Sequence, residues 1–168
     1  MKACILSVSG SVLTADEAAL FAAQQPWGVI LMGRSCVSRQ QVRQLVDDIW
    51  NAMQRPCLIF IDQEGGRVAR LKAPEWPLFP RGQDYAEIYA RDRDLGLSAA
   101  WLGHRLIASE LTNMAIHADC APVVDVPVAG AHDVIGDRAF GSDTETVASL
   151  AGAALAGLAA GGVAGVIK

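Results

Sequence analysis

Five short apolar runs are spaced along the chain and predict buried strands. In each run the apolar residues are mostly consecutive instead of alternating with polar ones, which is typical of strands covered on both faces. The five runs lie in ACILSV (3–8), GVILM (28–32), CLIFID (57–62), HADCAPVVDV (117–126) and GVAGVIK (162–168).

Four longer stretches between these runs predict helices, and three of them begin with the spacing of a capping box. The capping pairs are Thr14 with Glu17, Ser38 with Gln41, and Ser142 with Glu145. The predicted helices are TADEAALFAAQQ (14–25), SRQQVRQLVDDIWNAM (38–53), a long segment from about Asp92 to Met114, and SDTETVASLAGAALAGLAAGG (142–162). Before the third helix we expect a long polar loop that runs through Pro74, Pro77, Pro80 and Gly82.

This alternation predicts an α/β protein with a parallel sheet and right-handed helical crossovers. An open doubly wound sheet and a (β/α)8 TIM barrel both fit. No G-x-G-x-x-G follows the first strand, so a dinucleotide-binding sheet loses its main support. A barrel uses about 250 residues for eight units. We therefore expect residues 1–168 to supply about four βα units plus the fifth strand of one barrel domain, with the remainder beyond Lys168.

Composition and charge narrow the class of partner. Apolar residues make up 52% of the chain, which suits a globular protein. The net charge is −4 and the basic residues are scattered, so we expect neither a nucleic-acid nor a membrane partner. The N-terminal residues lack the pattern of a signal peptide, which predicts a cytoplasmic protein. The uncharged segment 147–167 is long enough to span a bilayer, but its Ala and Gly content favours a helix followed by a buried strand.

The four cysteines are far apart and form no C-x-x-C pair. We expect them to be free thiols in a reducing compartment. No His, Cys or Asp spacing resembles a metal-ligand set, so a metal-dependent barrel hydrolase is the weakest of the enzyme hypotheses. The cysteines are Cys4, Cys36, Cys57 and Cys120.

Polar residues gather where a barrel would use them. Asp62, Asp125 and Lys168 each lie at the carboxyl end of a predicted strand, and long loops follow the third and fourth strands. Barrel enzymes build their active sites on that rim. The rim is therefore the predicted site.

The stretch FIDQEGGRVARL (60–71) carries the densest chemistry. An ionised Asp62 can accept hydrogen bonds from two sugar hydroxyls, and Arg70 can donate two parallel ones. The alternatives are a strand-end ion pair of Asp62 with Arg67 or Arg70, and an ordinary surface arginine at position 70. Both alternatives stay open.

Glu64 lies two positions after Asp62, and the two carboxylates suggest a glycosidase couple. Both would approach a sugar from the same side instead of flanking the bond to be cleaved, so we reject them as a catalytic pair. We expect Glu64 to be a structural anchor paired with Arg67. Gly65 and Gly66 would let the chain pass close to a ligand.

Together these motifs resemble glycoside hydrolase family three, and most closely its bacterial single-domain β-N-acetylhexosaminidases. The resemblance rests on DQEGGRVARL, APVVDV, IGDRAF and VIK in this order, with GVILMGRS (28–35) as a further match. It implies a (β/α)8 barrel and a retaining glycosidase without metal or organic cofactor. The implied substrate is a peptidoglycan fragment with a terminal N-acetylglucosamine, processed in cytoplasmic cell-wall recycling.

The resemblance also implies roles for particular residues. Asp62, Arg70 and Arg138 would be ligands of the sugar, and Lys168 would be the lysine of the family's lysine–histidine pair. Asp125 would support the site. Three residues depart from the family pattern and leave substrate detail open: Ser35, Asp137 and Ala139.

We expect no catalytic residue in this chain, because the family's histidine and aspartate would fall beyond Lys168. We expect His104 and His117 to lie away from the rim and to be structural, and we expect His132 to be an exposed loop residue. Two other functions remain open. The chain could belong to a family relative that acts on β-glucosides, or it could be a catalytically silent fragment that binds sugar or packs on a partner.

Overall fold

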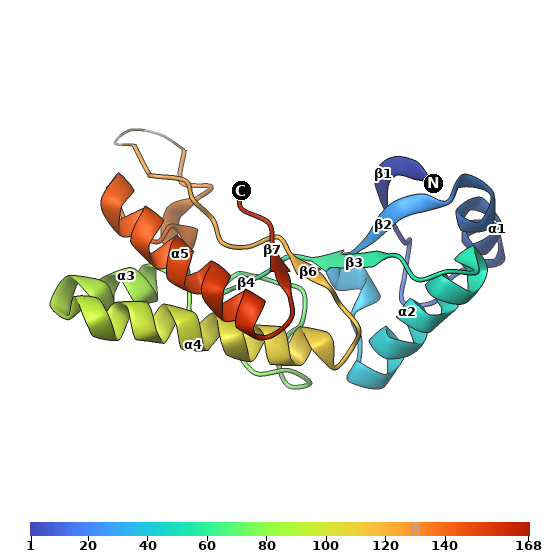
Figure 1. The fold of residues 1–168 in the computed structure, drawn as a ribbon, viewed down its shortest axis with the longest axis horizontal. Helices are drawn as coiled ribbons and strands as arrows, with labels where there is room; N and C mark the ends of the chain where they lie inside the picture. The colour runs from blue at the N-terminus through green and yellow to red at the C-terminus, as the bar shows by residue number, and fades with distance from the viewer. Residues whose placement is uncertain (129, 131) are drawn as a thin grey trace.

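The computed structural model describes residues 1–128, 130 and 132–168. At its centre is a five-stranded sheet in the order β1-β2-β3-β6-β7, in which every neighbouring pair is parallel (Figure 1). The strand order follows the chain and never reverses, as in a (β/α)8 barrel and unlike a doubly wound sheet. The strands are β1 (Lys2–Ser7), β2 (Pro26–Leu31), β3 (Leu58–Ile61), β6 (Ala118–Asp119) and β7 (Ala164–Gly165).

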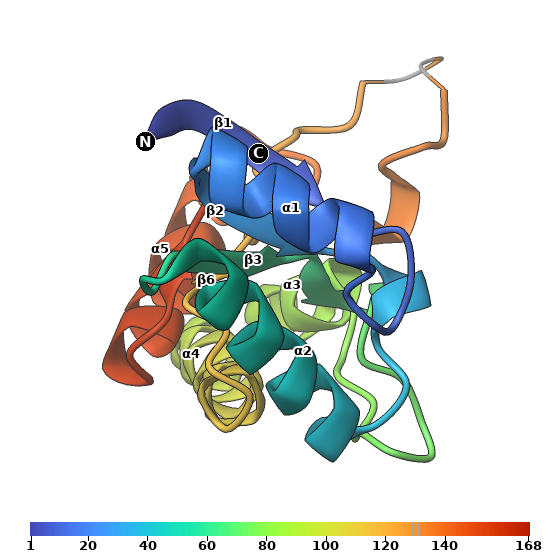
Figure 2. The same cartoon turned by 90° about the vertical axis from the view of Figure 1, so that its right-hand side faces the viewer.

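The connections between these strands contain α1 (Ala15–Gln24), α2 (Arg39–Met53), α4 (Arg93–Thr112) and α5 (Thr144–Ala160). The predicted four βα units plus a fifth strand are thereby confirmed. The first two helices pack against each other at one end of the molecule, which faces the viewer in Figure 2. The other two run side by side at the opposite end (Figure 1).

The core has two parts, and α4 contributes residues to both. The larger cluster joins β2 and β3 to α2 and α4, with Val29, Ile59, Leu45 and Ile107 almost fully excluded from solvent. The smaller cluster lies among the helices of the other end, around Phe140. Strands β2 and β3 are mostly buried, as their unbroken apolar runs predict, whereas the residues of β1 and β7 are exposed or partly buried.

Of the three predicted capping boxes, one is complete and one is present only as its N-cap. Thr14 and Glu17 form the full reciprocal box of α1, and Ser38 accepts a hydrogen bond from Gln41 N at α2. The third prediction is wrong, because α5 is capped by Asp143 one residue later. An aspartate can cap the backbone as well as a serine does, and its charge also suits the positive end of the helix.

The uncharged segment 147–167 forms most of α5 and the short strand β7. The helix and the strand are as predicted, but the strand is not buried, because Ala164 is exposed. Gly157 lets α5 approach α4 closely, because a Cβ there would lie 2.2 Å from Trp101 O. No helix in residues 1–128, 130 and 132–168 combines the length and the apolar character needed to cross a membrane.

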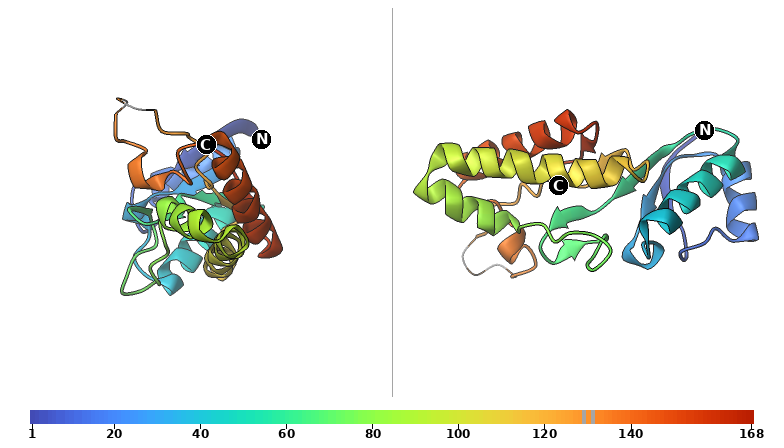
Figure 3. Two further views of the ribbon diagram at one scale, coloured as in Figure 1. Left: turned by 90° about the vertical axis from the view of Figure 1, so that its left-hand side faces the viewer. Right: turned by 90° about the horizontal axis from the view of Figure 1, so that it is seen from below.

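The sequence reading missed helix α3 (Gly82–Arg91), which follows the expected loop. Its N-cap is Arg81, whose backbone N–H is held by Asp84, and arginine is not a residue that marks a helix start. Seen from below, α4 is flanked by α3 and α5 (Figure 3). Gly103 on α4 makes room for α3, since a Cβ there would lie 2.0 Å from Tyr85 Oη.

The short antiparallel hairpin of β4 (Gln63–Gly65) and β5 (Val68–Ala69) was also missed. It directly follows β3, so it begins at the carboxyl rim of the sheet. Gly65 adopts φ +90°, and a Cβ there would lie 2.1 Å from Pro80 O. The group that approaches this glycine is the chain's own backbone, and the expected close approach to a ligand stays a prediction.

The fourth and fifth strands are shorter than predicted, since β6 and β7 have two residues each. Pairing continues irregularly beyond them: Lys168 N donates to Pro122 O at 3.2 Å, and Val124 N donates to Lys168 O at 2.7 Å. Pro122 has no N–H to give to a regular ladder, which explains the early end of β6.

We expect Gly65→Ala to lower the free energy of unfolding by at least about 2 kcal/mol, because it adds a strained backbone and a clash with a carbonyl oxygen. Urea unfolding of the full-length protein measures the change. Gly10→Ala is the matched control, since no atom lies within 4 Å of its Cβ position. Equal unfolding midpoints for the two variants would contradict the prediction.

Candidate functional site

The predicted site residues converge beyond the carboxyl ends of three strands. Asp62 follows β3 directly, and Lys168 lies three residues after the end of β7. Arg70 follows β5 of the hairpin, and Arg138 ends the short 3-10 helix η2 (Gly136–Arg138) in the loop after β6. At the centre of these residues lie two carboxylates, that of Asp62 and that of Glu64.

Asp62 is the first of these carboxylates. Arg70 Nη2 donates to its Oδ2 at 2.8 Å, and Lys168 Nζ donates to its Oδ1 at 2.5 Å. Burial would raise the pKa of Asp62, but the hydrogen bonds from Lys168 and Arg70 outweigh burial and hold the pKa below its usual range. Asp62 is therefore a permanent anion at neutral pH.

Glu64 is the second carboxylate, with only 6% of its side chain exposed. Arg138 grips it with a two-pronged contact, since Nε and Nη2 each donate to one of its oxygens at 2.8 Å. Lys168 Nζ lies 2.7 Å from Glu64 Oε1. The predicted pairing of Glu64 with Arg67 is wrong, because Arg67 points to the loop after β6 instead.

Lys168 joins the two carboxylates into one network. Burial would lower the pKa of its ammonium, but the hydrogen bonds to Asp62 and Glu64 outweigh burial and raise it. The hydrogen bonds to Glu64 likewise raise the pKa of Arg138. The network thus joins the basic side chains of Arg70, Arg138 and Lys168 to the carboxylates of Asp62 and Glu64.

A third carboxylate, Asp119 in β6, escaped the sequence analysis. It is fully buried, and its Oδ1 accepts from Gln63 N at 2.8 Å, next to Asp62. Its Oδ2 has no hydrogen-bond partner in the described part of the chain. Burial raises the pKa of Asp119 well above its usual range. The available signal was an acid inside the apolar run 117–126.

The sequence analysis selected Asp125 from the same run as the strand-end aspartate. The structure corrects this position, because β6 ends at Asp119 and Asp125 is exposed six residues later. The charge of Asp125 contributes, after that of Glu64, to the raised pKa of Arg138. Its supporting role remains a prediction.

The sequence analysis also missed Gln63, which fixes the backbone position of Arg70. Its buried side chain accepts hydrogen bonds from Arg70 N at 2.9 Å and Leu71 N at 3.0 Å, and it donates to Leu71 O. One side chain therefore satisfies both backbone amides at the end of the hairpin. The guanidinium of Arg70 can then reach Asp62.

The three histidines lie outside the network, in agreement with the sequence analysis. His104 is buried in α4, its Nδ1 donates to Ala100 O, and burial lowers its pKa to about 4. His117 Nδ1 accepts from Ile59 N at 3.2 Å. His132 is exposed on the loop after β6.

The four cysteines are free thiols, and only Cys57 is fully buried. Cys36 lies close to Arg70, and burial raises the pKa of the Cys36 thiol to about 12. Within residues 1–128, 130 and 132–168, no group of three His, Cys, Asp or Glu side chains is placed to hold a metal ion.

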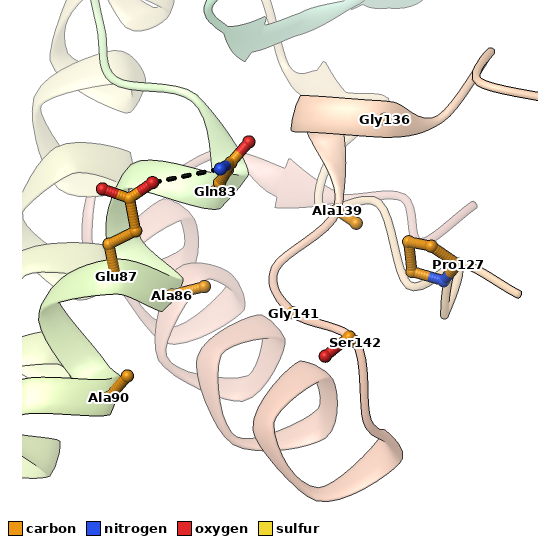
Figure 4. A pocket seen from close by; sticks show the side chains of 9 residues that line it. All are labelled: Gln83, Ala86, Glu87, Ala90, Pro127, Gly136, Ala139, Gly141 and Ser142. Atoms are coloured by element: carbon orange, nitrogen blue, oxygen red, sulfur yellow. Dashed lines mark hydrogen bonds between the residues drawn. The ribbon is translucent and has the colours of Figure 1, made fainter. Parts of the chain in front are cut away.

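A pocket of about 340 Å³ lies behind the loop that carries Arg138 (Figure 4). One wall is α3, with Gln83 and Glu87, which are hydrogen-bonded to each other. The opposite wall is the loop between β6 and α5, with Gly136, Ala139 and Ser142. The ion-pair network is not part of the described lining.

Comparison with known proteins gives a consistent result. Residues 5–168 match the family described as "Glycosyl hydrolase family 3 N terminal domain". A beta-hexosaminidase of Xanthomonas campestris pv. campestris (strain B100) is 37% identical over 164 residues, covering 98% of this chain and 49% of the relative. A beta-hexosaminidase of Stenotrophomonas maltophilia (strain R551-3) is 38% identical over 98% of this chain and 48% of its own length. The chain thus spans about half the length of these relatives.

Solved structures agree with the sequence comparison. The crystal structure of NagZ from Neisseria gonorrhoeae in complex with N-trifluoroacetyl-D-glucosamine matches with a TM-score of 0.91 and 30% identity, over 98% of this chain and 48% of that one. A family 3 beta-N-acetylglucosaminidase from Paenibacillus sp. str. FPU-7 matches with a TM-score of 0.87 and 28% identity, over 98% and 31% of the two chains.

We expect Glu64→Ala to lower the free energy of unfolding by roughly 3 kcal/mol, because it leaves Arg138 half-buried without its partner. Chemical unfolding of the full-length protein measures the loss. Glu145→Ala is the matched control, since Glu145 pairs with Arg93 while 76% of its side chain is exposed. That variant should lose at most about 1 kcal/mol. Similar losses in both variants would show that burial of the network adds nothing.

Proposed function

The chain belongs to glycosyl hydrolase family 3, and we propose that it supplies the substrate-holding half of a retaining β-N-acetylhexosaminidase. In this proposal residues 1–168 form the N-terminal part of one (β/α)8 catalytic domain. The enzyme removes terminal non-reducing N-acetylglucosamine. The observation that carries the proposal is the network of Asp62, Glu64, Arg70, Arg138 and Lys168 at the carboxyl rim of the sheet.

The chemistry of the network suits a polyhydroxylated ligand. A carboxylate has about four lone-pair positions, and the described bonds from Lys168 and Arg70 leave room for sugar hydroxyls on Asp62. The side chains of Lys168 and Arg70 are each 30% exposed, so N–H groups of Lys168 Nζ and of the Arg70 guanidinium other than the buried Nε can donate to the same hydroxyls. Acceptors and donors thus lie side by side.

Arg138 adds donors from the opposite loop. Its Nε and Nη2 hold Glu64, and its Nη1 donates to Val134 O at 3.3 Å. One hydrogen on Nη1 and one on Nη2 remain for a substrate group. In the proposal Glu64 therefore has a supporting role: it fixes Arg138 and Lys168 and does not take part in bond cleavage.

Asp119 and Asp125 support the site in different ways in this proposal. Asp119 anchors the backbone immediately after Asp62 through Gln63 N. Asp125 contributes charge near Arg138. The proton donor and the nucleophile come from outside residues 1–168, so no residue of this chain is proposed to be catalytic.

The proposed substrate class is a muropeptide, an N-acetylglucosamine-containing fragment of peptidoglycan. Support comes from the beta-hexosaminidase relatives and from the NagZ structure with N-trifluoroacetyl-D-glucosamine. The proposed setting is cytoplasmic cell-wall recycling, with no metal or organic cofactor and with neither nucleic acid nor membrane as a partner.

We expect Asp62→Ala in the full-length protein to lower kcat/KM for a chromogenic N-acetylglucosaminide by about 100-fold or more. The variant loses an acceptor for sugar hydroxyls, and each charge-assisted hydrogen bond contributes roughly 1.5–3 kcal/mol. Steady-state hydrolysis measures the effect. Asp47→Ala, which removes a surface ion pair with Arg43, should leave kcat/KM unchanged.

Unchanged KM and kcat in Asp62→Ala would contradict the assignment of Asp62 as a ligand of the sugar. The same assay run with a chromogenic glucoside separates the alternatives: faster turnover of the glucoside would favour a β-glucosidase. Binding of N-acetylglucosamine without hydrolysis of either substrate would favour a silent sugar-binding protein.

A further inference from the structure

We infer that Arg67 is a positioning residue that holds the loop after β6 so that Arg138 faces the saccharide. The inference rests on the proposed function, because it takes Arg138 as a ligand of the substrate. Arg67 lies in the turn between β4 and β5 and does not join the network of Asp62 and Glu64.

Arg67 grips the loop at three neighbouring residues. Its Nε donates to Asp137 Oδ1 at 2.9 Å, and its Nη2 donates to Val134 O at 2.6 Å and to Ile135 O at 3.3 Å. One guanidinium therefore contacts a side chain and two backbone carbonyls within four consecutive residues. A planar fork of this kind restrains both the position and the orientation of a loop.

The grip passes directly to Arg138. Arg138 N donates to Ile135 O at 2.9 Å in the 3-10 turn, and Arg138 Nη1 donates to Val134 O at 3.3 Å. Both carbonyl oxygens are also acceptors for Arg67. A movement of these carbonyls would therefore displace the guanidinium that holds Glu64.

A second arginine, Arg81, also contacts the loop at Asp137. Arg81 Nη1 lies 3.6 Å from Asp137 Oδ2, so the carboxylate of Asp137 sits between Arg67 and Arg81. The stem of Arg81 passes over Gly66, where a Cβ would lie 2.6 Å from Arg81 Cγ. The turn of the hairpin and the start of α3 thus hold the loop from the same side.

Among the described residues of this loop, Ala139 and Phe140 are buried and Arg138 pairs with Glu64, whereas residues 132–134 are exposed. Val128 and Val134 are 72% and 54% exposed, so they do not anchor it in the core. The pocket of about 340 Å³ separates part of this loop from α3, and Gly136 and Ala139 line it on the side of the loop (Figure 4). The exposed residues 132–134 depend on polar contacts for a fixed position, and the three hydrogen bonds from Arg67 to Val134, Ile135 and Asp137 are among those contacts.

A double-mutant cycle in the full-length protein tests this role. The variants are Arg67→Ala, Arg138→Ala and the double variant, assayed for KM and kcat with a chromogenic N-acetylglucosaminide. We expect Arg67→Ala to lower kcat/KM about 10-fold, since a ligand displaced by a fraction of an ångström loses much of its contact. In the Arg138→Ala background, Arg67→Ala should have no further effect.

Two conservative variants keep the test independent of folding. Arg67→Lys retains the charge but cannot reach three acceptors at once, and Asp137→Asn removes only the ion pairs, so each should lose less than Arg67→Ala. Arg93→Ala, which breaks the exposed pair with Glu145, is the control and should keep full activity. Thermal unfolding is recorded for all variants.

The possible failures are distinguishable. Full kcat/KM in Arg67→Ala, or additive losses in the double variant, would overturn the positioning role and leave the proposed function intact. Full activity in Arg138→Ala would overturn the assignment of Arg138 as a ligand, and the positioning role with it.

Discussion

The neutralisation of two closely spaced carboxylates is the constraint on which this site depends. Asp62 and Glu64 stand two residues apart at the mouth of the sheet, with 16% and 6% of their side chains exposed. Buried charges are costly unless they are paired and hydrogen-bonded. Their cations come from the hairpin, from the loop after β6 and from the end of β7, so charge pairing brings together segments up to 106 residues apart.

The same pairing prepares the site for a ligand. Arg70, Arg138 and Lys168 are held by the two acids before any sugar arrives, so little side-chain freedom is left to lose on binding. Hydroxyl groups can join these hydrogen bonds without displacing the charges from one another. The acids thus stabilise the fold and also orient the donors, which is consistent with a site that grips a substrate while other residues perform the chemistry.

The strand order and the positions of Asp62 and Lys168 at the rim could be predicted from the sequence, because they follow from the apolar runs and from the parallel arrangement of strands. Arg70 was selected from its motif, and Arg138 only from the resemblance to family three. The sequence did not suffice to predict which charged side chains pair with each other. Glu64 and Arg67 are close in sequence, but the turn of the hairpin sends Arg67 outward, and Glu64 pairs with Arg138, 74 residues away. Helix α3 was missed because Arg81 is an unusual cap. Asp119 was overlooked because an apolar run does not reveal which of its acids is buried.

The position of Lys168 has a consequence for tolerance to insertions. Its backbone N–H and C=O are both bonded to the segment after β6, at Pro122 and Val124. Successive side chains of an extended segment point to opposite faces. A slip of one residue would therefore exchange the ammonium for the neighbouring isoleucine and leave two acids without their shared cation. The length of the short segment from the double glycine to Lys168 is therefore constrained more strongly than the identity of its apolar residues.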